Sequence, residues 1–296
     1  MSGNIRKRKL QVRFAVCLLF LCLCGTVSSC GGGGSETKAP ACADCPPVSG
    51  EKASASNDDR LDVWFFACSD DADSILLQTG GSHIMIDTGT KEDAAMLMEK
   101  LRALQVEEID LLILTHPDKD HIGGAALLLD TFPVGEVVQT SFEKGSELQQ
   151  TLNGKLEEET VTVPEDNRVW TFGKLEVTVY PPQEVYEDSN NCSLATLAVY
   201  ENRTFFFAGD ARKKRIGELL AEELPRVDVY KAAHHGRDNG KSDDLVERLH
   251  PAYAVITAEE AQEKTQQALR EAGTQIISTY QKDVHFTVAE GILDVE

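Results

Sequence analysis

The sequence predicts an α/β fold, a four-layer αββα sandwich in which two mixed β-sheets are flanked by helices. Apolar runs of strand length alternate with helical patterns through two βαβ-like halves. Metal-ligand side chains follow several of these apolar runs where each strand ends, as expected for loops gathered at one edge of a sandwich. Residues 60–296 contain no second linker and no repeat, which indicates one sizeable domain.

Residues 1–29 have the character of an export signal. Five cations and no acid precede the apolar run Phe14–Cys24, which is too short for an ordinary transmembrane helix. Val27–Cys30 resembles a bacterial lipobox, which implies cleavage before Cys30 and lipidation of its thiol. We therefore expect a lipoprotein signal peptide and an exported, cell-surface lipoprotein anchored to the bacterial membrane. The alternative is an uncleaved membrane anchor.

Residues 30–59 predict a flexible tether. They are rich in Gly, Pro, Ala and Ser, a composition that cannot bury a core. Cys42 and Cys45 lie within this segment in Cys-x-x-Cys spacing. Because an exported chain meets an oxidising compartment, we expect them to form a small local disulfide.

The mature chain is strongly acidic. The whole sequence has 29 Lys and Arg against 49 Asp and Glu. Five of these cations fall in the expected signal peptide, which leaves 24 and a formal charge near −25. Such a surface repels polyanions and disfavours nucleic acid as a partner. No protein partner is indicated.

The domain opens with a run of β-prone segments and one helix. The turn Gly80-Gly81 separates two of the strands. Thr90 and Asp93 predict a capping box, and the apolar residues that follow have helical spacing. The expected strands are residues 61–66, 74–78 and 83–86, and the expected helix runs from about 90 to 104.

The segment after the next strand is the strongest functional signal. Leu111–Leu114 predicts a buried strand, and the pair Gly123-Gly124 leads into a helix that begins near Ala125. Packing does not require imidazoles and carboxylates here, whereas a pair of divalent cations does. The alternative is a polar loop that holds these residues by chance. The four candidate ligands are His116, Asp118, Asp120 and His121.

These residues resemble the second motif of the metallo-β-lactamase fold superfamily, His-x-[His/Asp]-x-Asp-His-x-Gly-Gly. With Asp118 in the variable place, the motif is most similar to the hydrolase domain of ComEC competence proteins. Ile86–Gly89 resembles the first motif, which implies that Asp87 orients the ligand loop. Asp73 matches the family's aspartate in a loop whose glycines are replaced here. The resemblance covers about residues 61–290.

The middle of the chain carries less chemistry. Short strands at 137–140, 169–172 and 175–180 are expected to close the first half of the sandwich. Asn190–Leu194 matches the family's Asn-Asn-x-Ser-Leu segment, which implies that Asn191 and Ser193 bind substrate or a metal-bound water. An Asn-rich turn before a strand explains the segment equally well. If both neighbourhoods border the site, Cys68 and Cys192 are expected to form a disulfide across it.

Two further motifs complete the resemblance. A strand at 204–208 ends in Gly209-Asp210, similar to the family's fourth motif, whose aspartate bridges two metals. A strand at 227–232 leads to His234-His235-Gly236, which resembles Lys-x-x-His-His-Gly-Ser, with Lys231 in place and Arg replacing Ser. We favour His235 as the metal ligand and His234 as an acid or hydrogen-bond donor toward substrate, although the sequence leaves their order open.

The rest of the chain alternates helix and strand and then closes with a hairpin. The family's Gly-His-Pro segment is absent, because residues 258–261 read Ala-Glu-Glu-Ala. The remaining expected elements are a helix at 212–223, a helix at 243–249, a strand at 252–257, a helix at 260–272 and a strand at 274–279.

The resemblance implies a hydrolase with two divalent metal ions. We expect these ions to be zinc, with manganese as the alternative. His116 and Asp118 would hold one ion, Asp120, His121 and His235 the other, with Asp210 between them. Asp120 and His234 are the expected catalytic residues, and Asp73, Asp87, Asn191, Ser193 and Lys231 the expected supporting or substrate-binding residues. The function that we expect is that of a phosphodiesterase or nuclease of the ComEC type. The alternatives are an esterase or lactonase on small ester substrates and a non-catalytic metal-binding surface lipoprotein.

Overall fold

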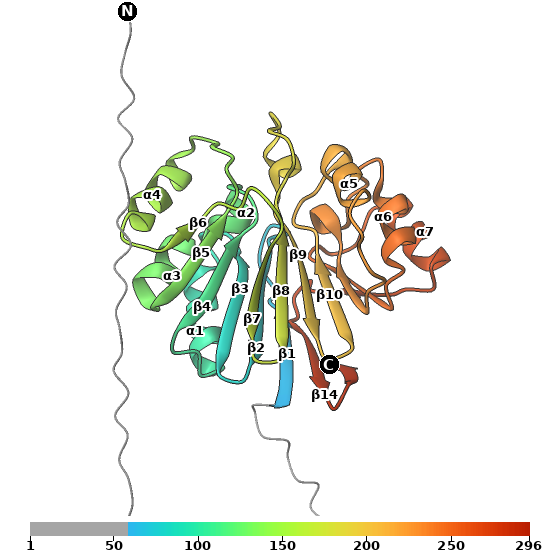
Figure 1. Ribbon diagram of the computed structural model, residues 1–296, viewed down its shortest axis with the longest axis horizontal. Coiled ribbons are helices and arrows are strands. Elements are labelled where there is room, and N and C mark those ends of the chain that lie inside the picture. Colours follow the sequence, from blue (N-terminus) through green and yellow to red (C-terminus); the bar gives the residue numbers. More distant parts are fainter. Residues whose placement is uncertain (1–58) are drawn as a thin grey trace, which may run out of the picture. The chain divides into compact units, whose positions relative to one another are not determined.

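The computed structural model describes residues 59–296, which form two β-sheets packed face to face with helices on both outer faces (Figure 1). The predicted αββα sandwich is confirmed. The expected signal peptide, its lipidated Cys30 and nearly all of the expected tether, with Cys42 and Cys45, lie outside the described residues. Within residues 59–296, no helix combines the length and apolar character needed to span a membrane.

The first sheet has eight strands in the order β15-β14-β1-β2-β3-β4-β5-β6. Its strands from β3 to β6 run parallel, connected by helices that cover the outer face. The elements of this half are β1 (Arg60–Phe65), β2 (Ser74–Thr79), β3 (Ser82–Thr88), α1 (Ala94–Ala103), β4 (Ile109–Leu114), α2 (Lys119–Ile122), α3 (Ala125–Thr131), β5 (Val134–Gln139), α4 (Glu147–Leu156) and β6 (Val161–Thr162).

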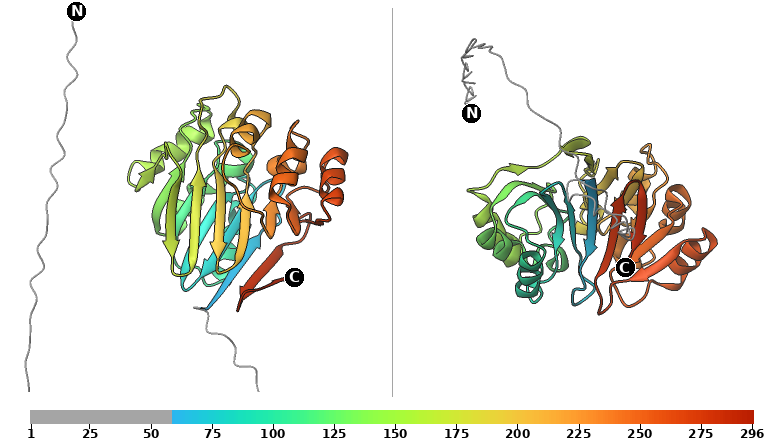
Figure 2. Two further views of the ribbon diagram at one scale, coloured as in Figure 1. Left: turned by 45° about the vertical axis from the view of Figure 1, so that its right-hand side comes forward. Right: turned by 90° about the horizontal axis from the view of Figure 1, so that it is seen from below.

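The second sheet has seven strands in the order β13-β12-β11-β10-β9-β8-β7. Strands β10 to β13 run parallel, and α5, α6 and α7 cover their outer face (Figures 1 and 2). Its elements are β7 (Arg168–Phe172), β8 (Leu175–Tyr180), η2 (Ser189–Cys192), β9 (Ala195–Tyr200), β10 (Arg203–Phe207), α5 (Lys213–Leu219), β11 (Val229–Lys231), η3 (Ala233–Gly236), α6 (Ser242–Leu249), β12 (Tyr253–Ile256), α7 (Glu263–Glu271) and β13 (Gln275–Ser278).

One expectation about these elements is wrong. Strands β7 and β8 were expected to close the first half, but they pair with each other and with β9 in the second sheet. The expected closing hairpin is present as β14 (Val284–Ala289) and β15 (Ile292–Val295), and β14 pairs antiparallel with β1 of the first sheet. Helix α4 was missed altogether.

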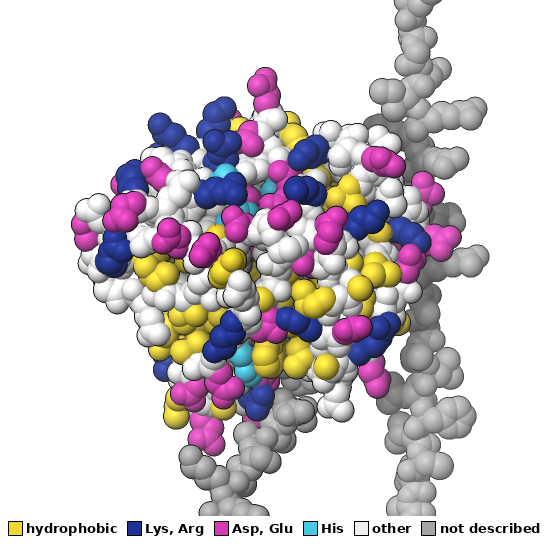
Figure 3. Space-filling model, turned by 180° about the vertical axis from the view of Figure 1, so that it is seen from behind, with side chains coloured by type: hydrophobic (Ala, Val, Ile, Leu, Met, Phe, Trp, Pro, Cys, Tyr) yellow, Lys and Arg dark blue, Asp and Glu magenta, His cyan; other side chains and the backbone are white. Residues whose placement is uncertain are grey.

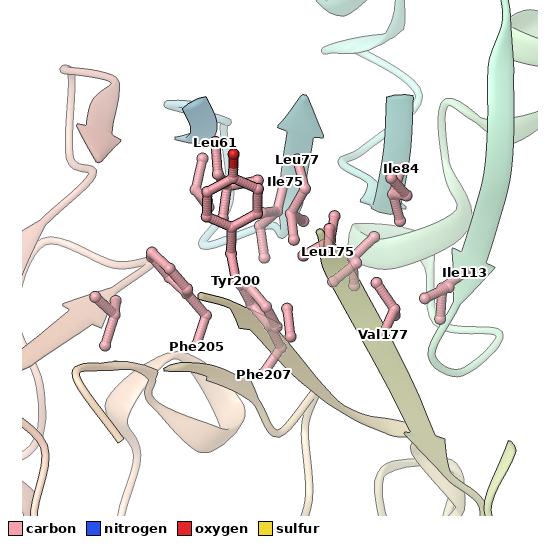
Figure 4. Packing of buried hydrophobic residues seen from close by; sticks show 14 of the residues in the cluster. Leu61, Ile75, Leu77, Ile84, Ile113, Leu175, Val177, Tyr200, Phe205 and Phe207 are labelled. Carbon is pink, nitrogen blue, oxygen red and sulfur yellow. The ribbon is translucent and has the colours of Figure 1, made fainter. Parts of the chain in front are cut away.

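The main core lies between the sheets, where both contribute apolar side chains (Figure 4). Strand β4 is buried on both faces, which explains its unbroken apolar run. Leu111 and Ile113 face the other sheet, and Leu112 and Leu114 pack under the helices. Because β3, β4, β10, β11 and β12 are oriented alike within their sheets, the loops after them gather at one edge.

Candidate metal centre

The loop after β4 depends on close backbone packing at Gly123. A Cβ atom there would lie 2.4 Å from the Lys91 nitrogen, and one at Gly124 would lie 2.5 Å from the Thr88 carbonyl oxygen. Both glycines have ordinary helical backbone angles. The sequence suggested that they allow a tight turn, but the structure shows that close approach to β3 and the following loop is what excludes a side chain.

Three residues of the site have a left-handed backbone conformation, which residues other than glycine rarely adopt. Asp87, His234 and His235 have φ values of 56°, 51° and 56°. Such conformations persist only where the surroundings enforce them, and they concentrate at functional sites. Here Asp87, near the end of β3, contacts His121, and the two histidines that follow β11 lie beside Asp210.

Two histidines from opposite sheets face the Asp210 carboxylate. His121 Nε2 lies 3.3 Å from Asp210 Oδ1, and His235 Nε2 lies 3.2 Å from Asp210 Oδ2. Asp120 Oδ2 lies 3.6 Å from His235 Nε2. Two atoms bound at about 2.05 Å to one tetrahedral ion are roughly 3.3 Å apart. The two histidines and Asp210 therefore have the spacing that a single cation requires, and Asp120, 4.0 Å from His121 Nε2, lies at the margin of this group.

His116 also faces the Asp210 carboxylate, and Asp118 faces His116, both at wider spacing. His116 Nε2 lies 3.9 Å both from Asp118 Oδ2 and from Asp210 Oδ2. Asp118 Oδ1 accepts a hydrogen bond from Lys144 Nζ at 2.9 Å. The second group is thus looser than the first, and one of its ligands already has a cationic partner.

Four ligand atoms in this cluster are buried without a hydrogen-bond partner among the described residues. They are the Nε2 atoms of His116, His121 and His235 and the Oδ1 atom of Asp210. Leaving a buried polar atom unpaired costs about 1–3 kcal/mol, so four at one place demand an explanation. Divalent metal ions bind neutral imidazole nitrogen and carboxylate oxygen, and the residues present fit such ions.

Asp87 holds His121 in position. His121 Nδ1 lies 2.7 Å from Asp87 Oδ2, and the same carboxylate accepts bonds from the Thr115 amide and hydroxyl at 2.8 and 2.7 Å. This contact fixes the ring and turns Nε2 toward Asp210. A carboxylate that orients a metal-binding histidine is a recurrent feature of metal sites.

Asp73 performs the corresponding task for His235. Asp73 Oδ1 accepts a bond from Thr257 Oγ1 at 2.6 Å and lies 3.3 Å from His235 Nδ1. Asp73 also forms an ion pair with Lys231. Its oxygens are close enough to His121, Asp210 and His235 to join a metal-binding group. Because they already serve Lys231 and Thr257, we assign Asp73 an orienting role instead.

Lys231 is a buried cation between two carboxylates. Its Nζ pairs with Asp73, lies 3.7 Å from Asp210 Oδ1 and donates to the Gly209 carbonyl at 3.2 Å. Burial lowers the pKa of Lys231, but Asp73 and Asp210 more than offset this and raise the pKa overall. The ammonium therefore remains charged and balances part of the negative charge of the cluster.

The pKa values show that the cluster attracts positive charge. Burial acts against the charged forms, yet Asp210 and Asp73 raise the pKa of His235 to about 10, and Asp210 and Asp87 raise the pKa of His121. Burial and the neighbouring His121 lower the pKa of His116 to about 3. Without a metal ion, protons on His121 and His235 neutralise the carboxylates.

His234 is oriented differently from the expected acid. Its Nε2 receives a hydrogen bond at 3.2 Å from Arg237, whose guanidinium can only donate, and its Nδ1 lies 2.9 Å from Asn239 Oδ1. Asn239 Nδ2 donates to two backbone carbonyls, which fixes its oxygen toward the imidazole. His234 is therefore protonated on Nδ1, and its Nε2, 3.8 Å from Asp210, is a hydrogen-bond acceptor.

The side chains of Asn191 and Ser193 form hydrogen bonds with other parts of the protein and do not face open space. Asn191 accepts from the Arg215 amide and donates to Asp188, and Ser193 Oγ accepts from the Asp210 amide. Asn190 is the residue of this segment that contacts His234, at 3.3 Å. The expected substrate role of Asn191 and Ser193 thus gives way to support of the Asp210 loop.

The expected disulfide between Cys68 and Cys192 is wrong. Both thiols are free in the structure. Cys192 Sγ is buried and donates to the Tyr186 carbonyl at 3.6 Å, whereas Cys68 packs beside Gly89 and Asp93. Burial raises the pKa of both thiols. The side chains point into different parts of the fold.

Four exposed cations surround the metal cluster, and we call them the basic rim. Each is held by an ion pair with an acidic side chain. Figure 3 shows histidine side chains at this edge of the molecule with Lys and Arg side chains, and Asp and Glu side chains among them, on all sides. Nothing in the sequence placed these cations near one another. The basic rim consists of Lys119, Lys144, Arg212 and Arg237.

Comparisons with known proteins identify a family and two related proteins. The family model described as "Metallo-beta-lactamase superfamily" matches residues 70–257. "Recombination protein 2" of Haemophilus influenzae is 28% identical over 188 residues, covering 62% of this chain and 22% of that protein. "ComE operon protein 3" of Bacillus subtilis is 29% identical over 210 residues, covering 67% and 27%. The chain thus spans about a quarter of the length of these relatives.

A solved structure shows the same fold. The metallo-beta-lactamase fold protein YhfI of Bacillus subtilis superposes with a TM-score of 0.53 and 13% sequence identity, covering 80% of this chain and 100% of that one. At this identity the likeness concerns the arrangement of the sheets and helices.

Proposed function

Because this chain belongs to the metallo-beta-lactamase superfamily, we propose that its buried cluster is the active site of a metal-dependent hydrolase that cleaves phosphodiesters. One observation carries the proposal. The unpartnered Nε2 atoms of His116, His121 and His235 face the carboxylate of Asp210, whose Oδ1 is itself unpartnered among the described residues. Packing alone gives no reason to bury four unpaired polar atoms together, whereas metal ligation satisfies all of them.

The ligands divide into two groups around Asp210. Asp120, His121 and His235 would hold one ion, and His116 and Asp118 the other. Zinc suits this mixture of nitrogen and oxygen ligands, and manganese is the alternative. When bound, a pair of such ions generates a nucleophile from water at neutral pH and stabilises the charge that develops on the substrate's oxygens.

His234 and Arg237 would act on the substrate side of the cluster. His234 Nε2 now accepts from Arg237 and Asn190, and it would accept a proton or a hydrogen bond from substrate once these donors turn to the substrate. This imidazole is the most exposed of the four in the cluster. The Arg237 guanidinium beside it can donate to phosphate oxygens in a bidentate manner. Together they would bind and orient a phosphoryl group.

The basic rim supports a phosphate-bearing substrate. The strong net acidity disfavours polyanions at long range, but an anion that reaches this edge meets four cations, each of which it can bind in competition with the aspartate that now pairs with it. The names of two relatives refer to recombination and to the ComE operon. A nuclease of the ComEC type is therefore within the proposal, on substrates small or flexible enough to reach the site. We also propose that Cys30 tethers the enzyme to the outer face of the membrane.

An activity screen tests the proposal. The purified chain, loaded with Zn²⁺ or Mn²⁺, is assayed against a chromogenic phosphodiester, single-stranded DNA, an aryl ester and a lactone. We expect metal-dependent cleavage of the phosphodiester and a loss of at least about 100-fold in Asp120→Ala. Asp130→Ala removes an exposed carboxylate on α3 as the control and should keep full activity. Turnover of the lactone or ester alone, or no turnover, contradicts the proposal.

A further inference from the structure

The two groups of metal ligands differ in how well they are prepared for an ion. His121 and His235 each have Nδ1 beside a buried carboxylate, and their Nε2 atoms lie 3.3 and 3.2 Å from Asp210. His116 Nδ1 contacts only the Thr115 hydroxyl, at 3.1 Å, and its Nε2 lies 3.9 Å from each carboxylate. In the first group the contacts of Asp210 with His121 and His235 match the roughly 3.3 Å spacing around one ion, and Asp120 lies at 4.0 and 3.6 Å from these rings. In the second group no contact matches it.

Asp118 in the weaker group is already paired. Lys144 Nζ donates to Asp118 Oδ1 at 2.9 Å. An ion that binds Asp118 must either displace this ammonium or lie beside it, and like charges repel. Lys144 therefore lowers the affinity of this position for a divalent cation.

The placement of Lys144 is built into the loop between β5 and α4. Gln149 is buried, and its side-chain oxygen accepts from the Lys144 and Gly145 amides at 2.7 and 2.9 Å. Its side-chain nitrogen donates to the Phe142 carbonyl at 3.1 Å. Three hydrogen bonds from one buried side chain thus fix the backbone from which Lys144 reaches Asp118.

We propose that the two metal positions fill in order, and that Lys144 sets the affinity of the second. The position formed by Asp120, His121, His235 and Asp210 fills first. The position formed by His116 and Asp118 fills only at higher metal concentration, when the ion overcomes the Lys144 ammonium. Lys144 thereby couples the state of the β5–α4 loop to metal occupancy. The inference rests on the metal centre of the proposed function and is independent of the substrate.

Titration of the metal-free chain with Zn²⁺, followed by calorimetry, tests the proposal. We expect two binding steps in the wild type, the second weaker by about tenfold or more. Lys144→Met should tighten the second step by about three- to tenfold and leave the first within about twofold. The control is Lys155→Met, which removes another half-exposed lysine of an ion pair from nearby α4 and should behave as the wild type.

Three results overturn the proposal: a second step that Lys144→Met leaves unchanged, equal tightening of both steps, or equal affinities in the wild type. The titration contains no substrate, so its outcome is separate from the activity screen. Ordered binding without phosphodiester cleavage would refute the proposed substrate and leave the role of Lys144 intact. Cleavage without ordered binding would do the reverse.

Discussion

Asp73 and Asp87 hold the two histidines that face Asp210 from opposite sheets. The sequence predicted the orienting role of Asp87, because the motif around it occurs at a strand end before the ligand loop. It could not predict Thr257, which bonds both Asp73 and His235, because 184 positions separate Thr257 from Asp73. Lys144 likewise carries no local signal. Contacts made by folding alone leave no pattern in the neighbouring sequence.

Lys231 is the residue whose loss should cost the most stability. Replacing it by Met leaves the buried Asp73 carboxylate without its partner, which costs about 3–5 kcal/mol. Urea denaturation of the metal-free chain measures this loss. Lys174→Met removes an exposed lysine that pairs with Asp59 and Glu201, and it should leave the free energy of unfolding nearly unchanged, because water screens these pairs. Equal effects would show that the buried pair contributes nothing special.

Metal affinity should rise with pH. In the metal-free protein the pKa of His235 is raised to about 10 and that of His121 is also raised, so both rings hold protons at pH 7. The ion needs their Nε2 atoms, so binding expels protons and is weaker at lower pH. His116, with a pKa lowered to about 3, is already neutral and releases none.

Calorimetry in buffers of different ionisation enthalpy measures this release. We expect between about one and two protons per ion in the first binding step at pH 7. If the first step released no proton and the affinity stayed the same from pH 6 to pH 8, the carboxylates would not hold these rings in the charged form.

At the scale of single elements, strands and caps followed sequence rules and one helix did not. Most strands lie within two or three residues of their predicted ends, because buried strands read as apolar runs. Helix α4 was missed because Gly154 and several polar residues interrupt its pattern, although Ser146 caps it by accepting from the Gln149 amide. The placement of β7 and β8 depends on pairing between distant segments, which local patterns do not encode.

Replacing two glycines by alanine tests whether close packing or helix propensity determines which residue each position accepts. Gly123→Ala places a Cβ atom 2.4 Å from backbone atoms of the loop after β3, and we expect a loss of about 1–3 kcal/mol. Gly154→Ala meets nothing within 4 Å in α4 and should stabilise the chain by about 0.5–1 kcal/mol through helix propensity. Thermal or urea unfolding measures the change in stability of both variants. A loss of stability in both would show that a side chain at position 154 of α4 also meets close neighbours.

At the scale of the whole molecule, net charge and local charge lead to different conclusions. The count of acids over cations disfavoured polyanions, but it could not show that Lys119, Lys144, Arg212 and Arg237 share the edge that carries the metal ligands. That arrangement depends on loops from both sheets meeting. The overall sandwich and the participation of His116, Asp118, Asp120, His121, Asp210 and His235 in one cluster were accessible from motifs, whereas the charge around them was not.

The account depends on the gathering of these acids and imidazoles around Asp210 to bind metal. Equilibrium dialysis against Zn²⁺, with metal counted by mass spectrometry, measures this directly in the wild type and in Asp210→Asn, which keeps the shape of the side chain and removes its charge. We predict up to two bound ions per chain in the wild type and less than about a tenth of that affinity in Asp210→Asn. A wild type that binds no zinc, or an Asp210→Asn variant that binds as tightly, would contradict the account.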